Sequence, residues 1–104
     1  MKHLIAHDLE LDTARKVTDH AFAEYKAKYA QYNPELRWSN ERQADIGFHA
    51  MGMTVKGSID VNEKQIAVDL DVPFLLRPFR TKALEVIERE VNRWIAKAKA
   101  GEVV

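Results

Sequence analysis

The sequence predicts an α+β fold: a two-layer sandwich in which an antiparallel sheet of four to five strands carries two helices on one face. The predicted order of elements is β-α-β-β-β-β-α. Apolar and polar side chains alternate through most of residues 44–72, which is typical of strands with one buried and one hydrated face. On either side of the strand-like half, apolar residues recur every three or four positions, as they do in amphipathic helices. With 104 residues, we expect one domain around one core.

The first part of the chain predicts a short strand over residues 2–8 and then a helix. Asp12 is a favourable N-cap, so the helix is expected to begin near it. Pro34 is expected to end it, because a proline disfavours helical geometry at the preceding residue, Asn33. The apolar stripe of this helix comprises Ala14, Val17, Ala21, Phe22, Tyr25, Tyr29 and Tyr32.

Four strand candidates follow, the first of them around Leu36 and Trp38. The others cover residues 44–50, 53–61 and 66–72. Met51-Gly52 predicts a turn or bulge between two of them, and Asn62-Glu63 predicts a tight hairpin turn. The apolar side of these three strands consists of Ala44, Ile46, Phe48, Ala50, Met53, Val55, Gly57, Ile59, Val61, Ile66, Val68, Leu70 and Val72.

A long amphipathic helix is predicted near the end of the chain, with Gly101 as its stop. Two one-sided helices can cover the apolar face of a single sheet, and this arrangement places Ile87 opposite Val68. The stripe of this helix comprises Ala83, Leu84, Ile87, Val91, Trp94, Ile95 and Ala98.

Composition excludes several classes of function. Sixteen basic and sixteen acidic residues cancel, so we expect no general attraction to nucleic acid, while self-association as a homodimer stays open. The chain has no cysteine, which excludes disulfides, thiolate catalysis and cysteine-ligated metals. No segment approaches the ~20 apolar residues of a membrane span, and the N-terminus lacks the apolar run of a secretory signal. We therefore expect a cytoplasmic protein.

The polar residues do not form a recognisable catalytic or metal site. His3 and His7 would lie about 13 Å apart along a strand, too far for one metal ion to bridge. Asp69 and Asp71 would share a strand face at about 6.6 Å and are the only plausible acid–base candidates, but the alternation predicts that both, like Asp60, are hydrated. Because there is also no glycine-rich phosphate loop, we expect no catalytic residues, no metal and no cofactor.

The segment before the last helix is the strongest binding candidate. Phe74, Leu75, Leu76 and Phe79 crowd four large apolar side chains into six positions, and Arg77 and Arg80 flank them. Some of these side chains could form an exposed apolar patch, which usually marks an interaction site. The more common alternative is that prolines 73 and 78 fold the segment into a lid over the core. Five aromatic residues could likewise line a pocket between the sheet and the helices, although such residues more often simply belong to the core: Trp38, Phe48, Tyr25, Tyr29 and Trp94.

At this level of detail the chain resembles the polyhydroxyalkanoic acid system proteins, which are bacterial proteins linked by genomic neighbourhood to storage of a hydrophobic polyester. The resemblance covers nearly the whole length. It rests on His7, the segment 11–15 (Leu-Asp-Thr-Ala-Arg) and Trp38, then on Phe48, Gly52, Gly57, Val61, Leu75, Leu76 and Phe79. It implies a role in granule metabolism and brings no catalytic residues. The order of elements is also similar to a shortened helix-grip fold, in which a C-terminal helix closes a curved sheet over a ligand cavity.

Two functions follow from these observations as expectations. The first is a non-enzymatic accessory protein that binds a granule surface, a granule protein or a second copy of itself. The alternative is a carrier of small acyl or hydroxyacyl ligands, with an apolar cavity between the C-terminal helix and the sheet. The candidate binding residues are Phe74, Leu75, Leu76, Phe79, Arg77, Arg80, Trp38 and Trp94.

Overall fold

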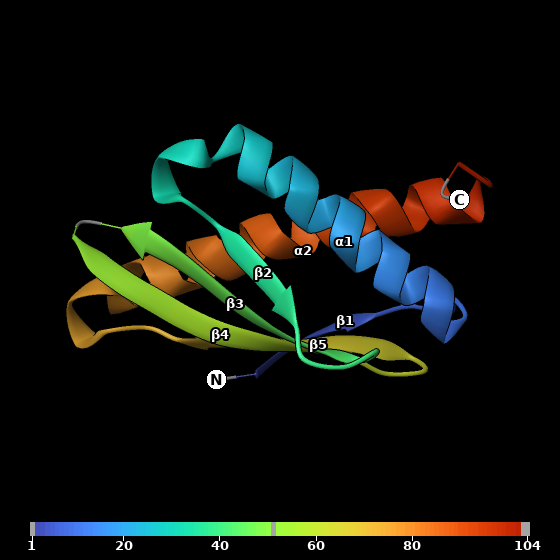
Figure 1. Ribbon diagram of the computed structural model, residues 1–104, viewed down its shortest axis with the longest axis horizontal. Helices are drawn as coiled ribbons and strands as arrows, with labels where there is room; N and C mark the ends of the chain where they lie inside the picture. Colours follow the sequence, from blue (N-terminus) through green and yellow to red (C-terminus); the bar gives the residue numbers. More distant parts are fainter. Residues whose placement is uncertain (1, 51, 103–104) are drawn as a thin grey trace.

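Five antiparallel strands form one sheet in the computed structural model, which describes residues 2–50 and 52–102. Both helices lie against the same face of this sheet (Figure 1). The predicted α+β fold and order of elements are therefore confirmed. The elements are β1 (Lys2–Ala6), α1 (Leu11–Lys28), the 3₁₀ turn η1 (Ala30–Tyr32), β2 (Glu35–Trp38), β3 (Gln43–Ala50), β4 (Met53–Val61), β5 (Gln65–Asp71), the 3₁₀ turn η2 (Phe74–Phe79) and α2 (Arg80–Lys99).

The strands β2 to β5 form a meander of consecutive hairpins, and β1 adds to its free edge beside β5, giving the order β1-β5-β4-β3-β2. A turn follows β4 as predicted, but it is centred one residue later, on Glu63 and Lys64, since Val61 pairs with Ile66 and the Asn62 N–H donates to the Gln65 carbonyl over 2.8 Å. Gly52 sits in the turn between β3 and β4 with φ of 76°, a value that favours glycine. Its predicted turn partner, Met51, lies outside the described residues.

The limits of α1 differ from the prediction at both ends. The helix begins at Leu11 with Glu10 as its extended N-cap, so Asp12 lies inside the first turn, where its charge complements the helix dipole. At the other end α1 stops at Lys28, five residues before Asn33. The backbone tightens into η1, and Asn33 takes a left-handed conformation with φ of 47°. Tyr29 and Tyr32 therefore leave the helix, although they continue its stripe in sequence.

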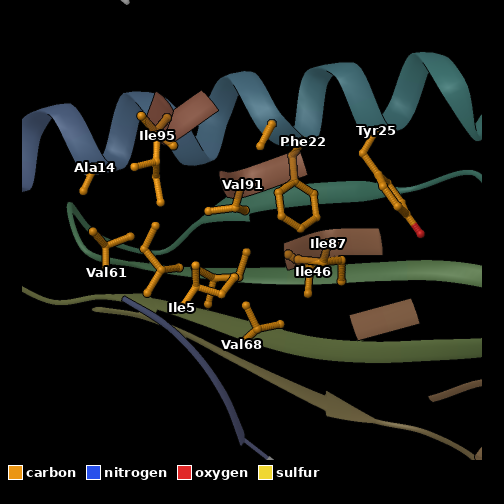
Figure 2. Close-up of a cluster of buried hydrophobic side chains, with 14 of the residues drawn as sticks. Ile5, Ala14, Phe22, Tyr25, Ile46, Val61, Val68, Ile87, Val91 and Ile95 are labelled. Carbon is orange, nitrogen blue, oxygen red and sulfur yellow. The ribbon is translucent and has the colours of Figure 1, made fainter. Parts of the chain in front are cut away.

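The core lies between the helices and the sheet. The predicted stripes supply it: α1 contributes Val17 and Phe22, and α2 contributes Ile87 and Val91. Ile87 and Val68 belong to the same buried cluster, which Figure 2 shows between the two layers. Alternate residues of the strands point to the opposite, more exposed face of the sheet, where Leu4 is half-exposed.

Candidate functional site

The segment between β5 and α2 is a compact turn whose conformation follows from its prolines. Pro73 has φ of −53° and ψ of 148°, an extended conformation, and it directly precedes η2. The Leu76 N–H donates to the Pro73 carbonyl over 2.8 Å and closes the first turn of η2. Pro78 fits within this 3₁₀ turn, and α2 starts directly after it at Arg80. The chain therefore reverses over only a few residues.

This short turn separates the four apolar side chains. Leu76 is only 3% exposed, as expected of a lid residue. Phe74, Leu75 and Phe79 are instead 77%, 69% and 54% exposed. The expectation of a lid is thus wrong for three of the four residues, because a tight 3₁₀ turn cannot direct all of them toward one side. We call Phe74, Leu75 and Phe79 the apolar surface.

Two arginines accompany the apolar surface, as the sequence indicates. The Arg77 guanidinium lies 5.4 Å from the centre of the Phe74 ring, in cation–π geometry. Arg80 begins α2 and is half-buried, because it turns toward a cavity next to the surface.

A cavity of about 470 Å³ lies near the end of α1 and the start of α2, beside the β3–β4 hairpin. These elements are at the left of Figure 1. The volume of the cavity is within the usual range of small-molecule sites. Most of its walls are apolar or aromatic. The lining residues are Tyr25, Tyr29, Tyr32, Phe48, Ala50, Val55, Val72, Leu76, Phe79, Arg80, Lys82, Ala83 and Val86.

Three tyrosines form one wall of this cavity. The ring centres of Tyr25 and Tyr29 are 4.9 Å apart, and those of Tyr29 and Tyr32 are 6.4 Å apart. Burial is the main reason why the pKa of the Tyr25 phenol is raised above its ordinary value. The sequence predicts Tyr25, Tyr29 and Phe48 as pocket or core residues, and all three line the cavity, whereas it assigns Tyr32 to the helix stripe alone. The spacing of the three tyrosines predicts that they lie together, but only the turn η1 shows that they border an open space.

The two tryptophans lie elsewhere. Trp38 Nε1 donates to Asp19 over 2.6 Å, and Arg15 lies over the ring at 4.4 Å. Trp94 Nε1 donates to Glu24 over 2.7 Å. Neither indole is among the residues that line the cavity. Trp38 thus connects β2 to α1, and Trp94 connects α2 to α1. A role for either tryptophan in binding stays a prediction.

The carboxylates considered as an acid–base pair lie on the outer face of the sheet. Asp69 pairs with Ser58 of β4, and Asp71 pairs with Lys56. Asp60 and Asp69 line a smaller hollow of about 250 Å³ with Asp45, whereas Asp71 is not among its lining residues. Asp69 and Asp71 lie two residues apart in β5 and share this face, but only Asp69 lines the hollow.

The histidines at the start of the chain serve separate contacts. His3 Nε2 is 3.3 Å from a carboxylate oxygen of Glu88, and His7 bonds to the backbone of Asn62. Across the described residues, no three His, Cys, Asp or Glu side chains are grouped as metal ligands. Within residues 2–50 and 52–102, no helix combines the length and apolar character that crossing a membrane requires.

Comparison with known proteins adds one finding. Residues 4–95 match the model of a protein family described as "Putative polyhydroxyalkanoic acid system protein". The match includes the apolar surface and every residue that lines the cavity. No curated protein and no solved structure matches the chain.

Proposed function

The chain belongs to the polyhydroxyalkanoic acid system protein family, and from this we propose that it is a non-enzymatic accessory protein of polyhydroxyalkanoate metabolism that binds the polyester of cytoplasmic storage granules. One observation supports this function above the others: Phe74, Leu75 and Phe79 expose large apolar side chains within a single turn of the chain. Grouped exposure of this kind is typical of interaction sites.

The apolar surface supplies a driving force for binding to a hydrophobic material. Transfer of a fully exposed Phe or Leu side chain out of water contributes about 1.5–3 kcal/mol. Phe74 and Leu75 are the most exposed of the three, so they gain most from being covered. The short turn also holds them in place before binding, which reduces the entropy lost on association.

The polar groups beside this surface match a polyester better than a protein. The guanidinium of Arg77 carries only hydrogen-bond donors. The repeating ester groups of polyhydroxyalkanoate carry only acceptors, so a donor next to an apolar surface is complementary to them. A protein partner would present donors and acceptors together. We therefore assign the polyester itself as the occupant, in preference to a granule protein or a second copy of the chain.

Co-sedimentation with purified granules tests this assignment. Wild-type protein should pellet with native granules and with granules stripped of their proteins. The double variant Phe74→Asp/Leu75→Asp should stay in the supernatant while its circular dichroism shows that it is folded. Leu4→Asp is the matched control, since Leu4 is a half-exposed apolar residue of β1 on the opposite face of the sheet.

Three results would contradict the assignment. Equal pelleting of wild type and the double variant would exclude the apolar surface as the binding site. Pelleting with native but not with stripped granules would identify a granule protein as the partner. A dimer that the double variant abolishes, with no granule binding by the wild type, would identify a second copy of the chain.

A further inference from the structure

We propose that the cavity between α1, the sheet and α2 is a second binding site, which takes a single alkyl chain ending in an anionic group. The apolar part would occupy the interior and the anion would lie between Arg80 and Lys82. This inference does not depend on granule binding, because the apolar surface and the cavity share only Phe79. The argument rests on the shape, the lining and the charges of the cavity.

The two ends of the cavity differ in how far their lining residues are buried. Tyr25, Val55 and Leu76 are buried and form its inner end. Tyr32, Phe79 and Lys82 are exposed and form its mouth. A ligand that is apolar at one end and charged at the other fits this gradient, since its chain would be shielded from water while its charge would stay near solvent. The raised pKa of the buried Tyr25 phenol is consistent with a weakly polar inner end.

The charges at the mouth are of one sign. Arg80 and Lys82 line the cavity, and no acidic residue is among its lining residues. Within the part of the chain that the structure describes, neither Arg80 nor Lys82 forms an ion pair with another residue. Two positive groups therefore face an apolar space that no acidic residue lines.

The position of these cations in α2 is unfavourable without a ligand. Arg80 and Lys82 lie in the first turn of a 20-residue helix, and this turn contains no acidic residue. The N-terminus of a helix carries partial positive charge, so cations there are destabilising and anions stabilising. An anion at the mouth would offset both side chains and the helix dipole together. Local rules of helix composition are most often broken at functional sites.

Isothermal titration calorimetry with three ten-carbon probes tests the site on the full chain: decanoate, decyl phosphate and the neutral decan-1-ol. At least one anionic probe should bind the wild type about tenfold more tightly than the alcohol does. Arg80→Gln/Lys82→Gln should weaken the anionic probe about tenfold and leave the alcohol unchanged. Arg89→Gln, an exposed cation further along α2, should change neither. Ala83→Phe, which fills the cavity, should weaken all three.

The comparison of the two anionic probes identifies the preferred head group. Absence of binding by all three probes would overturn the proposal, as would equal affinity of the wild type for the anions and the alcohol. Unchanged affinity in Arg80→Gln/Lys82→Gln or in a folded Ala83→Phe would overturn it too. The variant Phe74→Asp/Leu75→Asp should keep its affinity for the anionic probe, so failure of this site and failure of granule binding give different results.

Discussion

His7 Nε2 donates a hydrogen bond to the backbone carbonyl of Asn62 over 2.7 Å, joining two residues that are 55 positions apart in the sequence. The other ring nitrogen, Nδ1, accepts a hydrogen bond from the Leu9 N–H over 3.1 Å. These two contacts assign the proton to Nε2 of a neutral ring. The side chain is buried and connects the end of β1 to the turn between β4 and β5.

Replacing His7 by Leu should lower the free energy of unfolding by about 1–3 kcal/mol, because the Asn62 carbonyl and the Leu9 N–H would lose their partner in a poorly hydrated position. Urea unfolding followed by circular dichroism measures this. His49 is exposed, so His49→Ala serves as the control and should stay within about 0.5 kcal/mol of wild type. A His7→Leu protein as stable as the control would show that the two hydrogen bonds contribute little.

Gly57 in β4 has no room for a side chain. A Cβ atom there would collide with the Asp69 carbonyl oxygen and would lie 2.8 Å from Leu70 Cδ2. Gly57→Ala should therefore destabilise the protein by about 1–3 kcal/mol through overpacking. Gly47 in β3 is the matched control, since its Cβ would meet only the Val55 carbonyl oxygen at an ordinary 3.5 Å. Thermal unfolding of both variants checks the contrast, and equal melting temperatures would contradict it.

A substitution at Ile87 tests the packing of α2 against the sheet. It is 3% exposed within the main buried cluster, so Ile87→Ala should cost about 2–5 kcal/mol of unfolding free energy. Leu75→Ala removes a comparable side chain from the exposed turn and should cost no more than about 0.5 kcal/mol. Chemical denaturation of the two variants distinguishes a core from a surface position. Similar losses of unfolding free energy in both variants would contradict the packing of α2 against the sheet through Ile87.

Glu24 joins the two helices through several donors. It accepts hydrogen bonds from Trp94 Nε1, over 2.7 Å, and from Arg93, and Lys28 Nζ lies 3.3 Å from its carboxylate. Desolvation alone would raise its pKa, but the hydrogen bonds from Trp94, Lys28 and Arg93 and the charge of Arg93 together hold the pKa of the carboxyl below its ordinary value of 4.5.

Acid unfolding should reveal this contact. A carboxyl whose pKa is lowered on folding stabilises the native state above its unfolded pKa, and this contribution is lost as the pH falls through the lower native pKa. Glu24→Gln should therefore reduce stability at pH 7 and flatten the decrease of stability below about pH 4.5. Melting temperatures from pH 7 to pH 2 provide the measurement, with Glu85→Gln, at an exposed position of α2, as the control. Parallel profiles for wild type and Glu24→Gln would refute the prediction.

Local patterns in the chain predicted most of the fold. Alternation along residues 53–61 and 66–72 identifies strands and their buried side, because successive side chains of a strand point in opposite directions. The stripe containing Ile87 and Val91 identifies α2 for the same kind of reason, since residues three and four apart share a helix face. Such patterns depend on backbone geometry within a few residues. They place the ends of elements less well, as Glu10 rather than Asp12 at the start of α1 shows.

The candidate sites depended on contacts that no local pattern contains. The sequence alone determined that Phe74, Leu75, Leu76 and Phe79 crowd one turn, and the tertiary structure decided that Leu76 is covered and the other three are exposed. It also decided that the tyrosines at the end of α1 meet Arg80 and Lys82 around an open space. The physical reason is that exposure and cavities result from how distant segments pack against one another, whereas the periodicity of helices and strands is set by the chain's own neighbouring residues.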